Sequence, residues 1–261
     1  MTNPASTLLA VHLDRSSMLR PLLPALRAGV ADLLEAQSGP DEPEVVLSTG
    51  NDLTRSLADG SHPPAVPVPA HEALAALPAK LRALDGPDLR SGAHRLLDAV
   101  GEELAARPEA DRPGRVVVLL VGEGAVGDTT AVRERIAHQQ SAYAWEFVLV
   151  DVTTGGVPAE AQQSDVTAAG DVTGGAAAVA VKQRSGEPAA AARFGIPETA
   201  TITAGPGREG VTAALAAATS FVARARAAAP HEPVEGFSDE ERAAAARPDT
   251  RPGWKKLLRI A

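Results

Sequence analysis

Candidate chemistry in this chain begins at an acidic residue that directly follows an apolar run. Asp14 comes after segment 7–13 (TLLAVHL), and two hydroxyl residues, Ser16 and Ser17, follow it closely. The predicted strand therefore delivers polar side chains at its C-terminal end, where a parallel sheet binds its ligands.

A glycine-rich turn at residues 122–129 (GEGAVGDT) follows the most apolar segment of the chain and precedes a helical one. It fits the dinucleotide-binding pattern G-x-G-x-x-G and most of a phosphate-binding P-loop. Asp128 stands where a P-loop has its lysine, and a carboxylate there repels phosphates. Asp151 ends the next strand, at the ribose-binding position of a dinucleotide site, so nucleotide binding by 122–129 is the alternative function. The other interpretation is a tight turn that needs glycine for positive φ and close packing.

The serines and histidines do not form a convincing catalytic set. Ser16 or Ser17 as a nucleophile would need His94 as a base and Asp98 as an orienting acid, but these lie on another segment and no nucleophile elbow is present. His12 alternates with apolar residues, which is typical of a hydrogen-bonded histidine inside a sheet. We therefore expect a protein that is not an enzyme.

Composition narrows the partners and the compartment. The chain has 261 residues and no cysteine, which excludes disulfides, thiolate zinc sites and cysteine nucleophiles. A net charge of −8 and a pI near 5.3 argue against nucleic acid or an anionic membrane as a partner. The apolar run 8–13 is too short for a signal peptide core or a membrane span and has no basic residues before it, so we expect a cytoplasmic protein.

The elements that must position these residues alternate along the chain. Apolar runs predict strands at 7–13, 44–47, 115–121, 145–150 and 200–203, and helical periodicity predicts helices at 19–34, 71–84, 89–104, 129–141 and 207–228. This alternation predicts an α/β fold: a doubly wound, mostly parallel sheet of about six strands, with one antiparallel edge strand and helices on both faces. The ligand crevice of such a sheet lies at the C-terminal ends of its strands.

The predicted domain spans residues 1–229. It includes a surface loop at 60–69, which holds four prolines, and a long loop or insertion at about 153–186, where 176–181 (AAAVAV) is either a strand or the start of a helix. Residues 230–261 form a predicted C-terminal tail with a short helix at 238–246. The tail ends in an amphipathic segment at 254–260 (WKKLLRI), which would dock on a partner, on the domain itself or on a membrane surface.

Six segments, in order along most of the chain, resemble a group of bacterial cytoplasmic von Willebrand factor A (vWA) domain proteins. HLDRSSM (12–18) resembles LDRSGSM, SGAHRLLDAVG (91–101) resembles GMTALLDAIG, and RVVVLLVGEG (115–124) resembles VVVLLTDGEEN. HQQSAYAWEFVLVDV (138–152) resembles HQEREYGWEFLFLGA, and the pair Tyr143 and Trp145 is its most specific part. FGIP (194–197) and GFSDEERAAA (236–245) extend the resemblance into the tail.

The resemblance implies a degenerate metal-ion adhesion site (MIDAS). A working vWA site binds its cation through an Asp-x-Ser-x-Ser loop, a threonine and a second aspartate. Asp14 and Ser16 are the remnant ligands here; the second serine is either Ser17 or replaced by Met18, the threonine position reads His94, and the second aspartate position reads Gly122. We expect no bound cofactor, with magnesium as the weaker alternative.

Protein binding is the function that the resemblance implies. The module would bind another protein through its top-face loops or its tail, alone or as a subunit of a larger assembly. The partner class that the resemblance suggests is an AAA+ ATPase or a component of a stress or conflict system. The expected partner-binding residues are Asp14, Ser16, Ser17, His94, Gly122 and Glu123.

Overall fold

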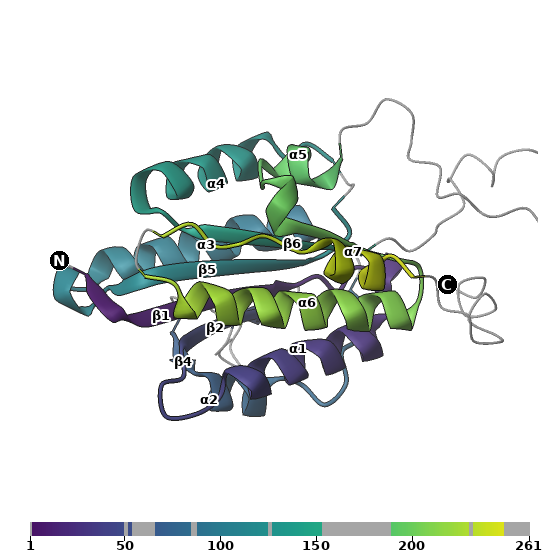
Figure 1. Cartoon of the computed structure of the whole chain (residues 1–261), viewed down its shortest axis with the longest axis horizontal. Coiled ribbons are helices and arrows are strands. Elements are labelled where there is room, and N and C mark those ends of the chain that lie inside the picture. Colours follow the sequence, from purple (N-terminus) through teal and green to yellow (C-terminus); the bar gives the residue numbers. More distant parts are fainter. Residues whose placement is uncertain are drawn as a thin grey trace, which may run out of the picture.

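A mostly parallel sheet forms the centre of the protein in this computed structural model (Figure 1). The structure describes residues 2–49, 52–53, 66–84, 88–124, 127–152, 189–229 and 232–247. Five parallel strands make up most of the sheet: β1 (Asn3–Leu13), β2 (Glu44–Thr49), β5 (Pro113–Gly122), β6 (Glu146–Val152) and β7 (Thr201–Ala204). They lie in the order β2-β1-β5-β6-β7. This arrangement confirms the predicted fold class.

Two short strands extend the sheet beyond β2, and both run antiparallel to it. They are β3 (Asp52–Leu53) and β4 (Val68–Pro69). The sequence predicts only one antiparallel edge strand and assigns 60–69 to a loop, so the interpretation is wrong for the last two residues of that loop. Backbone pairing with the open edge of β2 overrides the proline content there, because a proline is tolerated on an edge strand.

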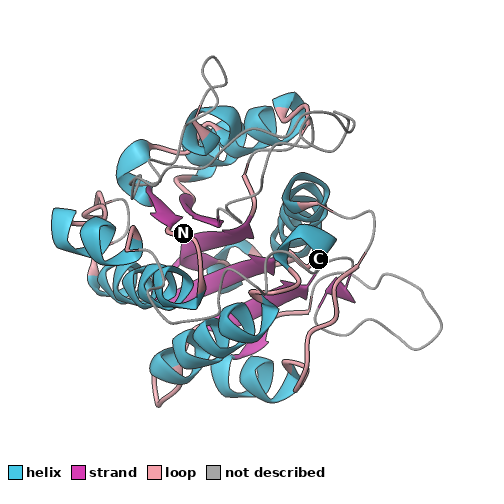
Figure 2. Ribbon diagram, turned by 90° about the vertical axis from the view of Figure 1, so that its right-hand side faces the viewer, coloured by secondary structure: helices cyan, strands magenta, loops and turns pink. Residues whose placement is uncertain are grey.

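Helices cover both faces of the sheet (Figure 2). One face packs against α1 (Leu23–Gln37), α2 (Ala70–Ala76), α6 (Arg208–Ala227) and α7 (Asp239–Ala245), and the other packs against α3 (Leu89–Ala106), α4 (Thr130–Tyr143) and α5 (Ala190–Phe194). Side chains alternate along a strand, so Leu9 and Val11 face one core while Leu8 and Ala10 face the other. This double burial explains why β1 and β5 are continuous apolar runs.

Two predicted helices differ from the observed ones at their ends. Residues 17–19 form the 3₁₀ helix η1 (Ser17–Leu19), and α1 begins only at Leu23, with a proline in its first turn. Helix α2 ends at Ala76 although the pattern predicts a helix to residue 84. Leu77 is extended, because a residue before a proline disfavours the helical conformation.

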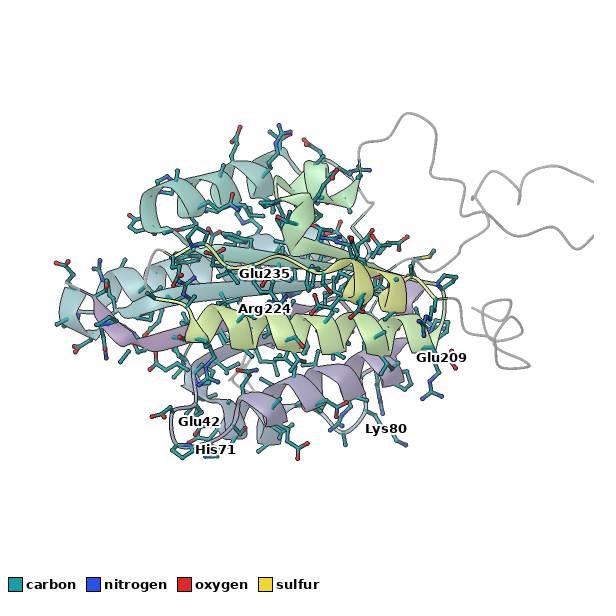
Figure 3. All side chains as sticks on the ribbon, viewed as in Figure 1. Glu42, His71, Lys80, Glu209, Arg224 and Glu235 are labelled. Atoms are coloured by element: carbon teal, nitrogen blue, oxygen red, sulfur yellow. The ribbon has the colours of Figure 1, made fainter. Side chains whose placement is uncertain are left out.

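Residues 232–247 pack on the domain rather than away from it. Phe237 and Ala245 are buried in the same core as α6, and the Phe237 ring lies 5.5 Å from the Phe221 ring. Arg224 of α6 donates to the backbone oxygen of Glu235 (Figure 3). The division of the chain into a domain and a tail at residue 230 stays a prediction, but the part of the tail that the structure describes contributes to the core.

The same segment covers the outer edge of β7. Phe237 N–H donates to the Thr199 oxygen and Gly205 N–H donates to the Ala245 oxygen, each at 2.8 Å. The Arg242 guanidinium donates to the Thr201 oxygen at 2.7 Å. An open strand edge is a template for unwanted pairing, and these contacts occupy it.

Several predicted segments lie outside the described residues: most of 60–69, the long loop 153–186 with its 176–181 segment, and the terminal segment 254–260. Within the described part, no helix has the length and apolar character needed to cross a membrane.

His12 is fully buried where α3 crosses the sheet. Its Nδ1 lies 2.9 Å from Ser48 Oγ, whereas Nε2 has no hydrogen-bond partner among the described residues. A Cβ at Gly92 would come within 2.0 Å of the ring, so the helix backbone packs directly on it. The prediction of a hydrogen-bonded sheet histidine therefore holds for one ring nitrogen only. Burial, assisted by Arg95 and opposed by Asp88, lowers the pKa of His12 to about 3.

His12 makes stability depend on pH in the mildly acidic range. Its folded pKa lies below the unfolded value of 6.5, so its contribution is fully present above 6.5 and is lost progressively as pH falls towards 3. We expect the free energy of unfolding to drop by about 2 kcal/mol between pH 6.5 and 5 from this group. Urea titrations of wild type and His12→Gln measure it. The variant must show a flatter pH dependence, while the exposed-site control His138→Gln must keep the wild-type slope.

Candidate functional site

Asp14 is the centre of the candidate site and lies at the C-terminal end of β1. The apolar strand stops at Leu13, and Asp14 N–H still donates to the Val121 oxygen of β5 at 2.8 Å. The carboxylate accepts from Ser16 N–H at 2.7 Å and from the Ser16 hydroxyl at 3.2 Å. These local bonds turn the chain sharply after the strand. Asp14 is 2% exposed, so its charge is held beneath the surface.

Gly122 and Glu123 complete the site from the neighbouring strand. A Cβ at Gly122 would lie 2.4 Å from the Asp14 Cβ, so only glycine allows this approach of β5 to Asp14. The Glu123 backbone N–H donates to the Asp14 carboxylate. The structure therefore brings together four of the six predicted site residues: Asp14, Ser16, Gly122 and Glu123. This backbone leaves no room for a side chain at position 122, so the aspartate that a working vWA site has at this position could not be accommodated here.

A second, half-buried carboxylate holds the other side of the glycine-rich turn. Asp151 of β6 accepts from Gly124 N–H at 3.0 Å, and a Cβ at Gly124 would meet Asp151 Oδ1 at 3.1 Å. The amides of residues 123 and 124 therefore donate to internal carboxylates, whereas a phosphate loop directs such amides to its ligand. Asp151, expected to contact a ribose under the nucleotide alternative, binds the turn itself.

The electrostatics of the site are unfavourable to ionised acids. Burial raises the pKa of Asp14, and although hydrogen bonds from Ser16 and Glu123 oppose this, the charge of Asp88 adds to it. Burial likewise raises the pKa of Asp151, opposed by the Gly124 N–H. No ion pair to Asp14 forms within the described part of the chain. A buried carboxylate without a cation is costly, and such groups gather at functional sites.

Asp88 is the residue that the sequence analysis missed. It caps α3 by accepting from Ser91 N–H at 2.8 Å, with Ser91 Oγ 3.2 Å from Asp88 N. Burial opposes ionisation, but the Ser91 hydrogen bonds and the Arg90 guanidinium lower its pKa. The sequence does carry a signal for this role: the pattern D-x-x-S stands directly before the segment with helical periodicity and is typical of a capping box, in which two residues cap each other's backbone N–H groups. Asp88 thus places a second negative charge in the field of Asp14.

The remaining predicted residues lie differently. His94 lies inside α3, within the helix predicted at 89–104, and its Nδ1 lies 3.0 Å from Asp98 Oδ2, one turn along the same helix. The cap at Asp88 starts α3 at Leu89, where the periodicity predicts the helix to begin. Ser17 begins η1 and is half-buried, and Met18 beside it is 52% exposed. The roles of His94 and Ser17 in partner binding stay predictions.

The donor set does not fit a magnesium ion. Such an ion takes several oxygen ligands in octahedral geometry. Here Asp14 supplies one carboxylate, the Ser16 hydroxyl already donates to it, and position 122 has no side chain. Across the described ranges, no group of three or more acidic or histidine side chains is close enough to hold a metal.

Comparisons with known proteins find solved structures of low similarity to this chain. No family model and no curated protein matches it. Proximal thread matrix protein 1 from the mussel byssus is 14% identical with a TM-score of 0.40, covering 59% of this chain and 38% of its own. Manganese-loaded TRAP protein of Plasmodium vivax is 11% identical with a TM-score of 0.40, covering 57% and 58%. The chain thus spans about two fifths to three fifths of these proteins.

Neutralising Asp14 or Asp151 should stabilise the protein. The pKa of each acid is higher in the folded than in the unfolded protein. The stability that the protonated acid contributes is therefore present below about pH 4 and is lost as the pH rises. At pH 7 the ionised acids lower the free energy of unfolding. Asn keeps an acceptor without the charge. We expect Asp14→Asn and Asp151→Asn each to raise Tm by about 2–4 °C, or ~1 kcal/mol. In calorimetry, the difference in Tm between each variant and wild type should disappear at acidic pH. Asp128→Asn should give no gain in Tm, because hydrogen bonds from Thr130 lower the pKa of the Asp128 carboxyl in the folded state.

The approach of Gly122 to Asp14 predicts intolerance of any side chain there. Gly122→Ala places a Cβ 2.4 Å from the Asp14 Cβ and should lower the free energy of unfolding by about 1–3 kcal/mol. Gly101→Ala is the matched control, since its Cβ would meet nothing nearer than 3.7 Å inside α3 and should stabilise by about 0.5–1 kcal/mol. Equal effects of the two substitutions in chemical denaturation would contradict this account.

Proposed function

We propose that this protein is a non-enzymatic protein-binding module of the vWA type that meets its partner at the C-terminal edge of the sheet, around Asp14. The observation that carries the proposal is the position of Asp14 in the topology. The order β2-β1-β5-β6-β7 reverses direction between β1 and β5. In open α/β sheets, ligands bind outside the carboxyl ends of the strands at this switch point.

The crossover connections support an opening at this point. The chain leaving β1 enters α1 on one face of the sheet, and the chain leaving β5 enters α4 on the opposite face (Figure 1). The two loops therefore part at Asp14 and Gly122. Ser16, Ser17 and Glu123 are half-buried beside the acid, and Met18 is exposed. A partner can contact these loops without unfolding any helix.

Charge indicates what the partner brings. Asp14 is buried, is repelled by Asp88 and has no ion pair within the described residues. In a low-dielectric surrounding an approaching cation interacts strongly with such a charge. A lysine or arginine of the partner supplies that cation, and Met18 supplies an apolar contact. The partner class stays the one that the vWA resemblance implies, an AAA+ ATPase or a stress or conflict component of a bacterial cytoplasm.

The proposal assigns no catalytic role to the serines of the site. The Ser16 hydroxyl donates to Asp14, and the imidazole of His94 pairs with Asp98. Among the residues that the structure describes, neither Ser16 nor Ser17 forms a hydrogen bond with His94, the base that a serine nucleophile would need. The role of the site is to present the Asp14 carboxylate and the loops around it to a partner protein.

Photo-crosslinking in the native cell tests the proposal. A photoreactive residue at position 18 should capture a stoichiometric protein partner, because Met18 is exposed beside Asp14. Position 143 is the matched control: Tyr143 is 59% exposed at the far end of α4, at the opposite edge of the sheet. In the position-18 protein, Asp14→Asn should lower the adduct yield about tenfold, the scale of one lost charged contact. Equal capture from both positions, or capture that ignores Asp14→Asn, would sink the proposal.

A further inference from the structure

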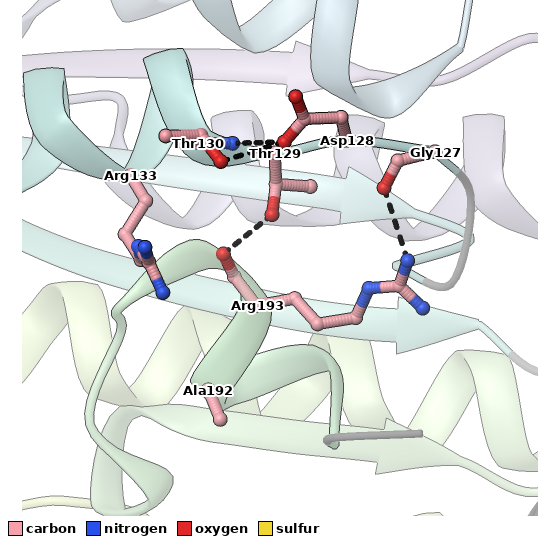
Figure 4. Close-up of a pocket in the computed structure, with 7 residues that line it drawn as sticks. All are labelled: Gly127, Asp128, Thr129, Thr130, Arg133, Ala192 and Arg193. Atoms are coloured by element: carbon pink, nitrogen blue, oxygen red, sulfur yellow. Dashed lines mark hydrogen bonds between the residues drawn. The ribbon is translucent and has the colours of Figure 1, made fainter. Parts of the chain in front are cut away.

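A cavity separate from Asp14 opens between the start of α4 and α5. Its volume is about 390 Å³, within the range of small-ligand sites (Figure 4). The turn 127–129 and the first residues of α4 line one side, and Ala192 and Arg193 of α5 line the other. Segments on both sides of β6 in sequence thus meet at this cavity.

The cavity concentrates positive charge in an acidic protein. Arg133 and Arg193 line it, and Arg90 of α3 donates to the Asp128 backbone oxygen at 3.1 Å. Among the described residues that line the cavity, Asp128 is the one acid. One oxygen of its carboxylate accepts from Thr130 N–H at 2.9 Å and from the Thr130 hydroxyl at 2.6 Å. Two arginines therefore line the cavity beside one carboxylate, in a chain whose net charge is −8, while the Arg90 guanidinium nearby also pairs with Asp88 at 3.1 Å.

Two glycines with positive φ make room for these arginines. Gly127 has a φ of 78°, and a Cβ there would lie 2.9 Å from Arg90 Nη1. Gly195 has a φ of 70°, and a Cβ there would lie 2.9 Å from Arg133 Cγ. The absence of a side chain at these two glycines thus leaves space for the Arg90 guanidinium and for the stem of Arg133.

Arg193 is anchored at both its ends. Its guanidinium donates to the Gly127 oxygen at 3.0 Å, and its backbone oxygen accepts from Thr129 Oγ1 at 2.7 Å (Figure 4). Arg133 differs, because it forms no hydrogen bond or ion pair with any residue that the structure describes. A guanidinium presents planar donors that match carboxylate and phosphate oxygens. Arg133 has those donors available at the wall of the cavity.

We propose that this cavity binds an oxyanion group, a carboxylate or a phosphate, with Arg133 and Arg193 as its ligands. The site does not use the backbone amides at 123 and 124, which donate to Asp14 and Asp151. It is independent of the protein-binding edge proposed above. Asp128 limits the negative charge that the cavity accepts, so a single oxyanion group fits it better than a polyphosphate.

Titration of the full chain with inorganic phosphate and with succinate tests this site. Both probes should give saturable chemical-shift changes at the backbone amides of residues 127–130, at an ionic strength held constant with sodium chloride. Arg133→Gln should weaken both affinities about tenfold or more, as expected for a lost charged hydrogen bond. Asp128→Asn should strengthen both, because it removes the repelling charge of the acid that lines the cavity while keeping an acceptor for Thr130.

Arg135→Gln is the matched control, since Arg135 lies on the same helix but pairs with Asp98. It should leave both affinities unchanged. A hexapeptide of glutamates distinguishes the source of the group: tighter binding than succinate identifies a partner protein's acidic segment, and equal binding identifies a free small anion. The proposal is overturned if neither probe saturates, if sodium chloride alone reproduces the shifts, or if Arg135→Gln weakens binding as much as Arg133→Gln.

Discussion

The parallel pairing of β1 with β5 is the interaction on which the rest of the structure depends. Leu8 to Leu13 pair in register with Val116 to Val121, and both strands bury side chains on both faces. Each face then requires a layer of helices, which explains the doubly wound architecture. The register also fixes Asp14 beside Gly122. A slip of one residue would turn every side chain of β1 to the opposite face and move the acid away from the turn.

The free energy gained by this central packing offsets costs that are concentrated near one edge. His12 lies one register step below the end of β1, and one of its ring nitrogens has no partner among the described residues. Asp14, which is buried, and Asp151, which is half-buried, lie above it with raised pKa values. Each feature alone lowers the stability of the fold at some pH. Locally unfavourable groups that a well-packed sheet holds in place are typical of sites retained for binding.

The periodicity of the sequence was sufficient for the class of fold and for the centres of the long elements. β1, β5 and α3 are strongly patterned, and their observed bounds lie within a few residues of the predicted ones. Predictions for weakly patterned segments were wrong where tertiary contacts decide the structure. Strand β4 is an example, because it forms by pairing with the open edge of β2. At the site, Asp14 and Gly122 followed from the ends of apolar runs. Asp88 was missed because its D-x-x-S helix cap was overlooked, and the arginine cavity joins segments that only the folded chain brings together.

The path of residues 232–247 determines whether the chain ends up beside the C-terminal or the N-terminal ends of the parallel strands. Ala245 bonds to Gly205 just beyond the end of β7, so Arg247 lies at the C-terminal edge of the sheet, the edge that also holds Asp14. Asn3, by contrast, bonds to Arg112 at the other edge. Whatever is joined after Arg247 is therefore tethered near the Asp14 loops at a high effective concentration, whereas a fusion before Asn3 is held a full strand length away. The two ends of this domain are not equivalent as points of attachment.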